Sequence, residues 1–231
     1  MAKVLRYLMF SFLLVIICNA YAQNEKFEGT VRYSLIMDTT GVKGIPAQAV
    51  SMMKSMEIIY KIKGDHFRMD SKTMVSNTAV IADNKKQTAF TLMDMMGYKY
   101  LIKITPEDMK KEMDSPAPKI KFLDATKEIA GYICKKAEVT VPENQLMGEY
   151  TTTVFYTDKI PNVKGYGAKF KELDGFPLEY SIEINGMKIH VAATSVTKEK
   201  IEEETFLIPK GYKETTLEGL QEDMKKNMGA K

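Results

Sequence analysis

The feature that most constrains this chain is the alternation of apolar and polar residues on both sides of Asn185-Gly186. Successive side chains of a strand point to opposite faces, so a period of two is typical of a strand with one buried face. Asn-Gly supplies the positive φ angles of a two-residue type I′ turn, and the segment therefore predicts a β-hairpin. The apolar positions are Leu178, Tyr180, Ile182 and Ile184 before the turn, and Met187, Ile189, Val191 and Ala193 after it.

The same alternation recurs along most of the chain. It is clearest from Phe27 to Met37, where every second residue faces one side and polar residues such as Arg32 face the other. The cluster Asp83, Asn84 and Lys85 predicts a second hairpin turn. Further strands are expected at residues 56–62, 66–73, 78–82, 87–93, 98–104, 133–141 and 150–157. The sequence thus predicts a mainly β protein built on an antiparallel sheet.

Helix signals are few. Thr105 followed by Pro106 is typical of a helix start, and this helix would run to about Asp114 with Met109 and Met113 on one face. It would stop before Pro116 and Pro118, which we interpret as a surface crossover. A C-terminal helix is expected from a Thr215–Glu218 capping box, and a third helix at residues 46–53. One face of the C-terminal helix would carry Leu217, Leu220, Met224 and Met228.

The first 22 residues have the pattern of a secretory signal. Lys3 and Arg6 precede an apolar run at residues 8–18, and Ala20-Tyr21-Ala22 predicts cleavage after Ala22. The run is too short to remain as a stable membrane span. We therefore expect a periplasmic or secreted protein with one domain at residues 23–231. Lipidation at Cys18 is an alternative, although Ile17 replaces the small residue that such signals prefer.

Charge and motifs argue against several classes of function. The 33 Lys and Arg residues nearly balance 30 Asp and Glu and are scattered, so no basic face for nucleic acid is predicted. No nucleophile elbow, zinc motif or phosphate loop is present, and we expect no enzyme, metal or cofactor. His66, Arg68 and Asp70 are interpreted as a solvated charge row. A hydrolase, the third hypothesis, would need two of His66, Asp70, His190 and the acidic residues to converge in a cleft.

Sulfur-containing side chains are the unusual part of the composition. The chain has 17 methionines and no tryptophan, with clusters at Met52, Met53 and Met56 and at Met93, Met95 and Met96. Methionine is flexible enough to fill an irregular core or to line an adaptable apolar cavity, and its thioether also binds Cu(I). Cys134 is alone after signal cleavage and is expected to be a small buried residue rather than a reactive thiol.

Four segments carry a resemblance to a known family. They are Ile129 to Val139 (IAGYICKKAEV), Val154 to Pro161 (VFYTDKIP), Gly175 to Tyr180 (GFPLEY) and Ile208 to Tyr212 (IPKGY). With these segments the chain, from about Phe27 to Tyr212, resembles exported domain-of-unknown-function proteins grouped with the LolA-like fold of outer-membrane lipoprotein carriers. The resemblance implies a strongly curved antiparallel sheet, an unclosed half-barrel, with two or three short helices packed on its concave side.

The resemblance also implies a function. In carriers of this fold the concave side receives acyl chains, so we expect a non-enzymatic protein that binds a lipid or acyl chain in an apolar cavity. No basic docking patch is visible, which favours passive binding over active lipoprotein shuttling. The alternative is a structural or envelope-assembly protein that contacts another envelope protein and has no small-molecule ligand. The residues expected to line the cavity are Tyr33, Met53, Met56, Tyr60, Met93, Met109, Met113, Tyr180 and Ile182.

Overall fold

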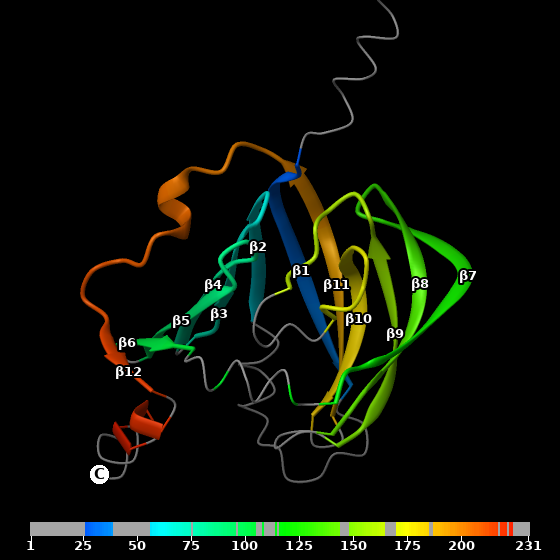
Figure 1. Ribbon diagram of the computed structural model, residues 1–231. Helices are drawn as coiled ribbons and strands as arrows, with labels where there is room; N and C mark the ends of the chain where they lie inside the picture. Colours follow the sequence, from blue (N-terminus) through cyan, green and yellow to red (C-terminus); the bar gives the residue numbers. More distant parts are fainter. Residues whose placement is uncertain are drawn as a thin grey trace, which may run out of the picture.

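The fold is one open, curved sheet of twelve strands. The computed structural model describes residues 26–38, 56–74, 76–95, 97–104, 108, 114, 116–143, 148–164, 170–184, 187–216, 218–220 and 222–223. The strands run in the spatial order β12-β6-β5-β4-β3-β2-β1-β11-β10-β9-β8-β7. Figure 1 shows the sheet bent into a trough, with β2–β6 forming one wing and β7–β11 the other, on either side of β1.

Hairpins build both wings. The central strand is β1 (Glu28–Asp38). The first wing consists of β2 (Glu57–Lys63), β3 (His66–Lys72), β4 (Ser76–Asp83), β5 (Thr88–Met95) and β6 (Tyr98–Lys103). The second wing is β7 (Lys119–Ile129), β8 (Tyr132–Val141), β9 (Tyr150–Thr157), β10 (Phe176–Ile184) and β11 (Met187–Lys198). The predicted antiparallel sheet is confirmed, and neighbouring strands are antiparallel except for β12 (Lys213–Thr215), which runs parallel to β6.

The hairpin predicted around residues 185 and 186 forms. Strands β10 and β11 pair antiparallel, and Ile184 lies opposite Met187, so two residues separate the strands. Residues 185 and 186 themselves lie outside the described residues. The pairing places Tyr180 opposite Val191 and Ile182 opposite Ile189, which gathers the apolar residues of both strands on one face.

Two strands were missed in the sequence. Strand β7 is a long outer strand whose side chains are mostly exposed, so it lacks the apolar alternation that reveals half-buried strands. Its turn into β8 is made by Ala130 and Gly131, with φ of 49° and 82°, a conformation that alanine seldom adopts. Strand β12 has only three residues and is held by its pairing with β6.

Helical structure is sparse within the described residues. Residues 203–206 form a short 3-10 helix, η1 (Glu203–Phe206), and residues 218–220 and 222–223 are helical. The last helix is capped by Thr216, whose Oγ1 accepts a hydrogen bond from the Gly219 amide at 3.1 Å, because Thr215 belongs to β12. The Thr215–Glu218 capping box was therefore placed one residue early. Of the helix expected at residues 105–114 only Asp108 and Asp114 are described, both helical, and residues 46–53 lie outside the described residues.

The inner face of the trough holds the main core. Val31, Ile62 and Leu178 are fully buried there, together with Phe67 and Phe176. Gly175 directly precedes β10, and its backbone passes the Thr157 carbonyl of β9 so closely that an added Cβ would lie 2.4 Å from that oxygen. A glycine is therefore required at this position, which gives a structural reason for the Gly175-Phe176-Pro177 motif.

Candidate functional site

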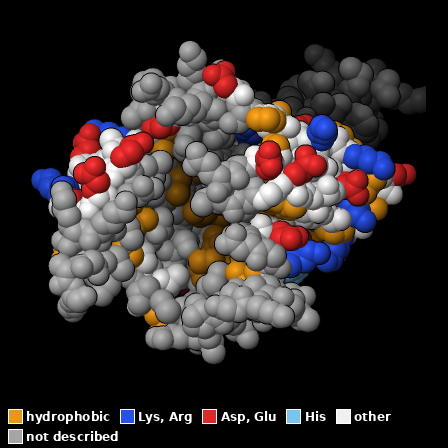
Figure 2. Space-filling view, turned by 90° about the horizontal axis from the view of Figure 1, so that it is seen from below, with side chains coloured by type: hydrophobic (Ala, Val, Ile, Leu, Met, Phe, Trp, Pro, Cys, Tyr) orange, Lys and Arg blue, Asp and Glu red, His pale blue; other side chains and the backbone are white. Residues whose placement is uncertain are grey.

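A cavity of about 410 Å³ opens on the inner face of the trough. Figure 2 shows hydrophobic side chains gathered in the hollow near the middle of this face. The described residues that line it come from β1 to β5, from β10, from the end of β6 and from the connection between β9 and β10. They are Tyr33, Tyr60, Phe67, Met69, Val80, Ala82, Ala89, Thr91, Ile104, Asn162, Val163, Phe170, Phe176, Pro177, Tyr180 and Ile182.

Small side chains make room for the cavity. Ala82 of β4 and Ala89 of β5 lie directly opposite each other in the strand pairing, and both face the hollow. Cross-strand neighbours on one face are about 5 Å apart, so two opposed alanines leave a gap that larger pairs would fill. Strand β4 is paired with β3 on one side and with β5 on the other, which holds the two alanines in this arrangement.

Aromatic rings form the opposite wall. Tyr60 packs edge-to-face against Tyr33 and Phe176, with ring centroids 5.7 Å and 5.2 Å away. Tyr180 packs edge-to-face against Phe170 at 4.9 Å. Such pairs add about 0.5–1.5 kcal/mol to the burial of the rings and fix their orientation. The wall is thus rigid as well as apolar.

The polar atoms of the wall are mainly phenols. The Tyr33 hydroxyl donates a hydrogen bond to the Pro177 carbonyl at 2.6 Å. Burial raises the pKa of Tyr60 to about 12 and raises the pKa values of Tyr33 and Tyr180 well above the usual range. The phenols therefore stay protonated at neutral pH, and no Lys, Arg, His, Asp or Glu is among the described residues that line the cavity.

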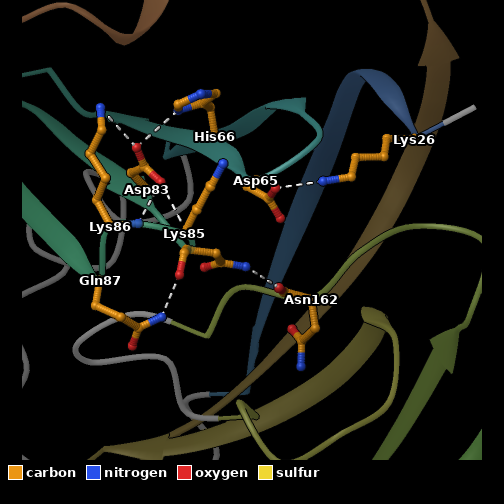
Figure 3. Close-up of polar contacts among 9 residues, drawn as sticks. Lys26, Asp65, His66, Asp83, Lys85, Lys86, Gln87 and Asn162 are labelled. Carbon is orange, nitrogen blue, oxygen red and sulfur yellow. Dashed lines mark hydrogen bonds and ion pairs between the residues drawn. The ribbon is translucent and has the colours of Figure 1, made fainter.

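One connection ties the two wings together across the cavity. We call the described residues 158–164 and 170–175, between β9 and β10, the strap. The Asn84 side chain accepts a hydrogen bond from the Lys164 amide at 3.0 Å. It also donates one to the Asn162 carbonyl at 2.9 Å, and Figure 3 shows the labelled Asn162 beside the β4–β5 turn. Asn162 in turn donates to the carbonyls of Phe170 and Leu173 at 2.6 and 3.0 Å. The β4–β5 turn thus fastens the strap, which carries Val163 and Phe170 into the wall.

The other face of β9, β10 and β11 carries a second hollow of about 450 Å³, which we call the outer hollow. Within it Ser181 and His190 are cross-strand partners, with Oγ and Nδ1 3.4 Å apart, and Lys127 pairs with Glu179 at 2.7 Å. No hydrogen bond joins His190 to a carboxylate within the described part of the chain, so a Ser-His-acid relay is not assembled. The outer hollow is lined by Glu149, Tyr150, Thr151, Thr152, Thr153, Phe155, Glu179, Ser181, Ile182, Glu183, Lys188 and His190.

The structure sorts the residues expected at the site into three groups. Tyr33, Tyr60, Tyr180 and Ile182 line the cavity. Met56 and Met93 are not among the lining residues, and Met93 instead packs beside Tyr100, Ile102 and Leu220. Met53, Met109 and Met113 lie outside the described residues.

Several lining residues were missed. Met69, Ala82, Ala89 and Phe176 lie in or beside predicted strands, yet nothing in their local pattern separates a cavity wall from a packed core. Strand register brings them together, since Phe67 pairs with Ala82 and Ala82 pairs with Ala89. The sequence signal for the cavity was the pair of small residues, Ala82 and Ala89, at inward positions of two adjacent hairpin strands.

The other candidate groups have structural partners. Arg68 pairs with Asp70 at 2.9 Å and His66 lies 3.6 Å from Asp83, so the predicted charges do pair, but the row is half-buried and not solvated, because Arg68 also donates to the Thr205 carbonyl of η1. Cys134 is buried, and burial raises the pKa of its thiol to about 11, so the thiolate is disfavoured as expected. Within the described ranges no cluster of three or more His, Cys, Asp or Glu residues could hold a metal ion.

Comparison with known protein families places the chain in one family. The chain belongs to a family described as a domain of unknown function, DUF4412, which matches residues 27–212. The match spans the trough from just before β1 to just before β12. No curated protein matches the chain. Among the described residues no helix is long and apolar enough to cross a membrane.

Proposed function

We propose that this protein is an exported, non-enzymatic binding protein that holds an apolar ligand, a lipid or acyl chain, in the cavity of its trough. The observation that carries the proposal is a cavity of about 410 Å³ on the inner face, where a plain structural domain would have a filled core. Small-molecule sites measure about 300–1,000 Å³ and are lined mostly by apolar and aromatic side chains with few polar groups. The cavity fits that description.

The wall chemistry favours an acyl chain. Each buried methylene group contributes about 0.8 kcal/mol to binding through removal of apolar surface from water. Phe67, Met69, Val80 and Ile182 offer such surface, and the sheet holds it in place before a ligand arrives. A preformed apolar wall avoids part of the ordering cost that binding would otherwise carry.

The proposal includes a LolA-like architecture and an extracytoplasmic location. An open, curved antiparallel sheet with a cavity on its inner side supports the first. The signal pattern at residues 1–22 supports the second. Fractionation of cells expressing the full chain tests the location, because an exported protein leaves the cytoplasmic fraction and loses its first 22 residues.

The experiment for binding is native mass spectrometry of protein purified from the cell envelope, followed by lipid extraction. We expect a lipid-sized mass increment on the wild-type protein. The variant Ala89→Leu, which places a larger side chain in the cavity, should lose most of that lipid and keep its fold. Thr88→Leu is the matched control, because Thr88 is exposed and its side chain points away from Ala89. Wild-type protein free of lipid that also fails to bind a fluorescent, uncharged fatty-acid ester would sink the proposal.

A second function is favoured by one observation. Strand β7 is the outer strand of the sheet, and Phe122 on it is 60% exposed, which suits contact with another envelope protein. This structural role predicts that Phe122→Lys abolishes capture of a partner while Ala89→Leu has no effect. The binding role predicts that Ala89→Leu loses the bound lipid while Phe122→Lys keeps it.

A further inference from the structure

We propose that the cavity selects uncharged ligands with a hydrogen-bond acceptor, an acyl ester or amide rather than a free carboxylate, and that the Tyr60 and Tyr180 hydroxyls donate to it. This inference rests on the proposed function and specifies its ligand class. It starts from the difference between the three phenols of the wall.

The three phenols do not share one role. The Tyr33 hydroxyl is occupied by the Pro177 carbonyl, an interaction within the wall itself. The Tyr60 and Tyr180 hydroxyls have no hydrogen-bond partner among the described residues, although both side chains are only partly exposed and line the cavity. A phenol that faces a mainly apolar cavity without a protein partner is open to an acceptor from a ligand, since polar groups shielded from bulk water are normally paired. A ligand acceptor would supply that partner.

The wall gives no support to a charged group. Besides the phenols, the polar side chains of the wall are Thr91 and Asn162, and the Asn162 amide already donates to two backbone carbonyls. An ionised carboxylate would lose its hydration here without meeting a lysine or arginine among the described lining residues. An ester or amide carbonyl loses far less hydration and gains hydrogen bonds from neutral donors. The raised pKa of Tyr60, about 12 because of burial, keeps that donor protonated.

Strand register indicates where the chain of such a ligand would lie. Tyr60, Met69, Val80 and Thr91 are direct partners on four neighbouring strands, and all four line the cavity. Neighbouring strands are about 4.8 Å apart, so this row is roughly 14 Å long. A carbonyl at Tyr60 would therefore place an attached alkyl chain along the row toward β5.

The test compares three ligands of equal chain length: methyl dodecanoate, dodecanoate and dodecane. Their displacement of a fluorescent fatty-acid methyl ester, an uncharged probe, is measured on the wild-type full chain and on Tyr60→Phe, Tyr180→Phe and the double variant. Each replacement removes one hydroxyl and keeps the ring, so the aromatic wall is retained. Tyr98→Phe, at a tyrosine that is 52% exposed and does not line the cavity, is the control.

We expect each of the two inner replacements to weaken the methyl ester about three- to tenfold, the effect of one hydrogen bond, and to leave dodecane unchanged. We expect dodecanoate to bind more weakly than its ester above the pKa of the acid. Equal losses for ester and dodecane, or no loss for either, would overturn this inference while binding of dodecane upholds the proposed function. Failure of all three ligands to displace the probe would overturn both.

Discussion

The inner cavity and the outer hollow adjoin at β10, which contributes residues to both, and have similar volumes, about 410 and 450 Å³. Their linings differ sharply. The inner cavity is walled by phenyl, phenol and aliphatic groups without a described charge, whereas the outer hollow has Glu149, Glu179, Glu183, Lys188 and His190. Volume alone therefore does not distinguish a binding site from a groove of the surface.

Strand periodicity explains the difference. On β10 the side chains of Tyr180 and Ser181 leave opposite faces, so one residue packs against the strap and its neighbour faces polar groups and solvent. The comparison indicates that residues of the inner cavity stabilise the fold through packing and through exclusion of water. Residues of the outer hollow interact mainly through exposed charge pairs, which contribute little to the free energy of unfolding. The two faces should respond very differently to equivalent changes.

The largest expected difference comes from truncating adjacent residues. Tyr180→Ala removes the ring that packs on Phe170, and we expect a loss of roughly 3 kcal/mol in the free energy of unfolding. Ser181→Ala removes only a hydroxyl with a long contact to His190 and should change that free energy by less than about 0.5 kcal/mol. Urea unfolding measures both. Equal losses would contradict the assignment of the two faces.

The next effect is a pH dependence to which the inner phenol of Tyr60 contributes. Burial raises the pKa of Tyr60 from 10.0 to about 12, so the folded state holds the phenol proton more tightly than the unfolded state. This stability is fully present below pH 10 and is lost as the pH rises toward 12. The loss is about 1.4 kcal/mol per pH unit for each such phenol.

Alkaline unfolding followed by tyrosinate absorbance checks this prediction. Tyr60→Phe should flatten the fall in stability between pH 10 and 12 and remove one late-titrating phenol. Tyr98→Phe, at an exposed position, should leave the profile of the wild type. A Tyr60→Phe profile identical to the wild type would show that Tyr60 is not shielded from water.

The sequence was sufficient to predict where most strands lie but not how they pair over long range. Alternation located β1 to β6 and β8 to β11, and the Asn185-Gly186 dipeptide located one hairpin, because these signals are local. Strand β7 escaped because an outer strand of the sheet with exposed side chains has no apolar face to reveal it. The C-terminal cap was placed at Thr215 instead of Thr216 because the pairing of β12 with β6 is a long-range effect.

The cavity was harder to predict for the same reason. Tyr33, Tyr60, Tyr180 and Ile182 follow from inward alternation alone. Ala82 and Ala89 become informative only once the register places them opposite each other. The methionine clusters drew attention because methionine is common in adaptable sites, yet Met69, outside those clusters, lines the wall while Met93 packs elsewhere. Among the described residues, membership of a methionine cluster therefore did not indicate which methionine lines the cavity.

A smaller effect tests the strap, from which Val163 and Phe170 line the inner cavity. Asn84→Ala removes the two hydrogen bonds to the backbone of Asn162 and Lys164, and should lower the free energy of unfolding by roughly 1–2 kcal/mol. Release of a bound fluorescent fatty-acid ester should become faster, because the strap is less firmly held. Lys85→Ala in the same turn is the control, since its side chain is exposed. Stopped-flow release at unchanged rates in Asn84→Ala would contradict a gating role for the strap.

The smallest effect is expected in the outer hollow. Lys127 donates to both carboxylate oxygens of Glu179, at 2.8 and 2.7 Å, but the Lys127 side chain is 48% exposed. Lys127→Ala should therefore lower the free energy of unfolding by only about 0.5–1 kcal/mol, a difference that shrinks in high salt. Urea unfolding at low and high ionic strength measures it, with Lys121→Ala as an exposed control on the same strand. A loss as large as that of Tyr180→Ala would mean that the outer hollow is a shielded site, and the contrast between the two faces would then fail.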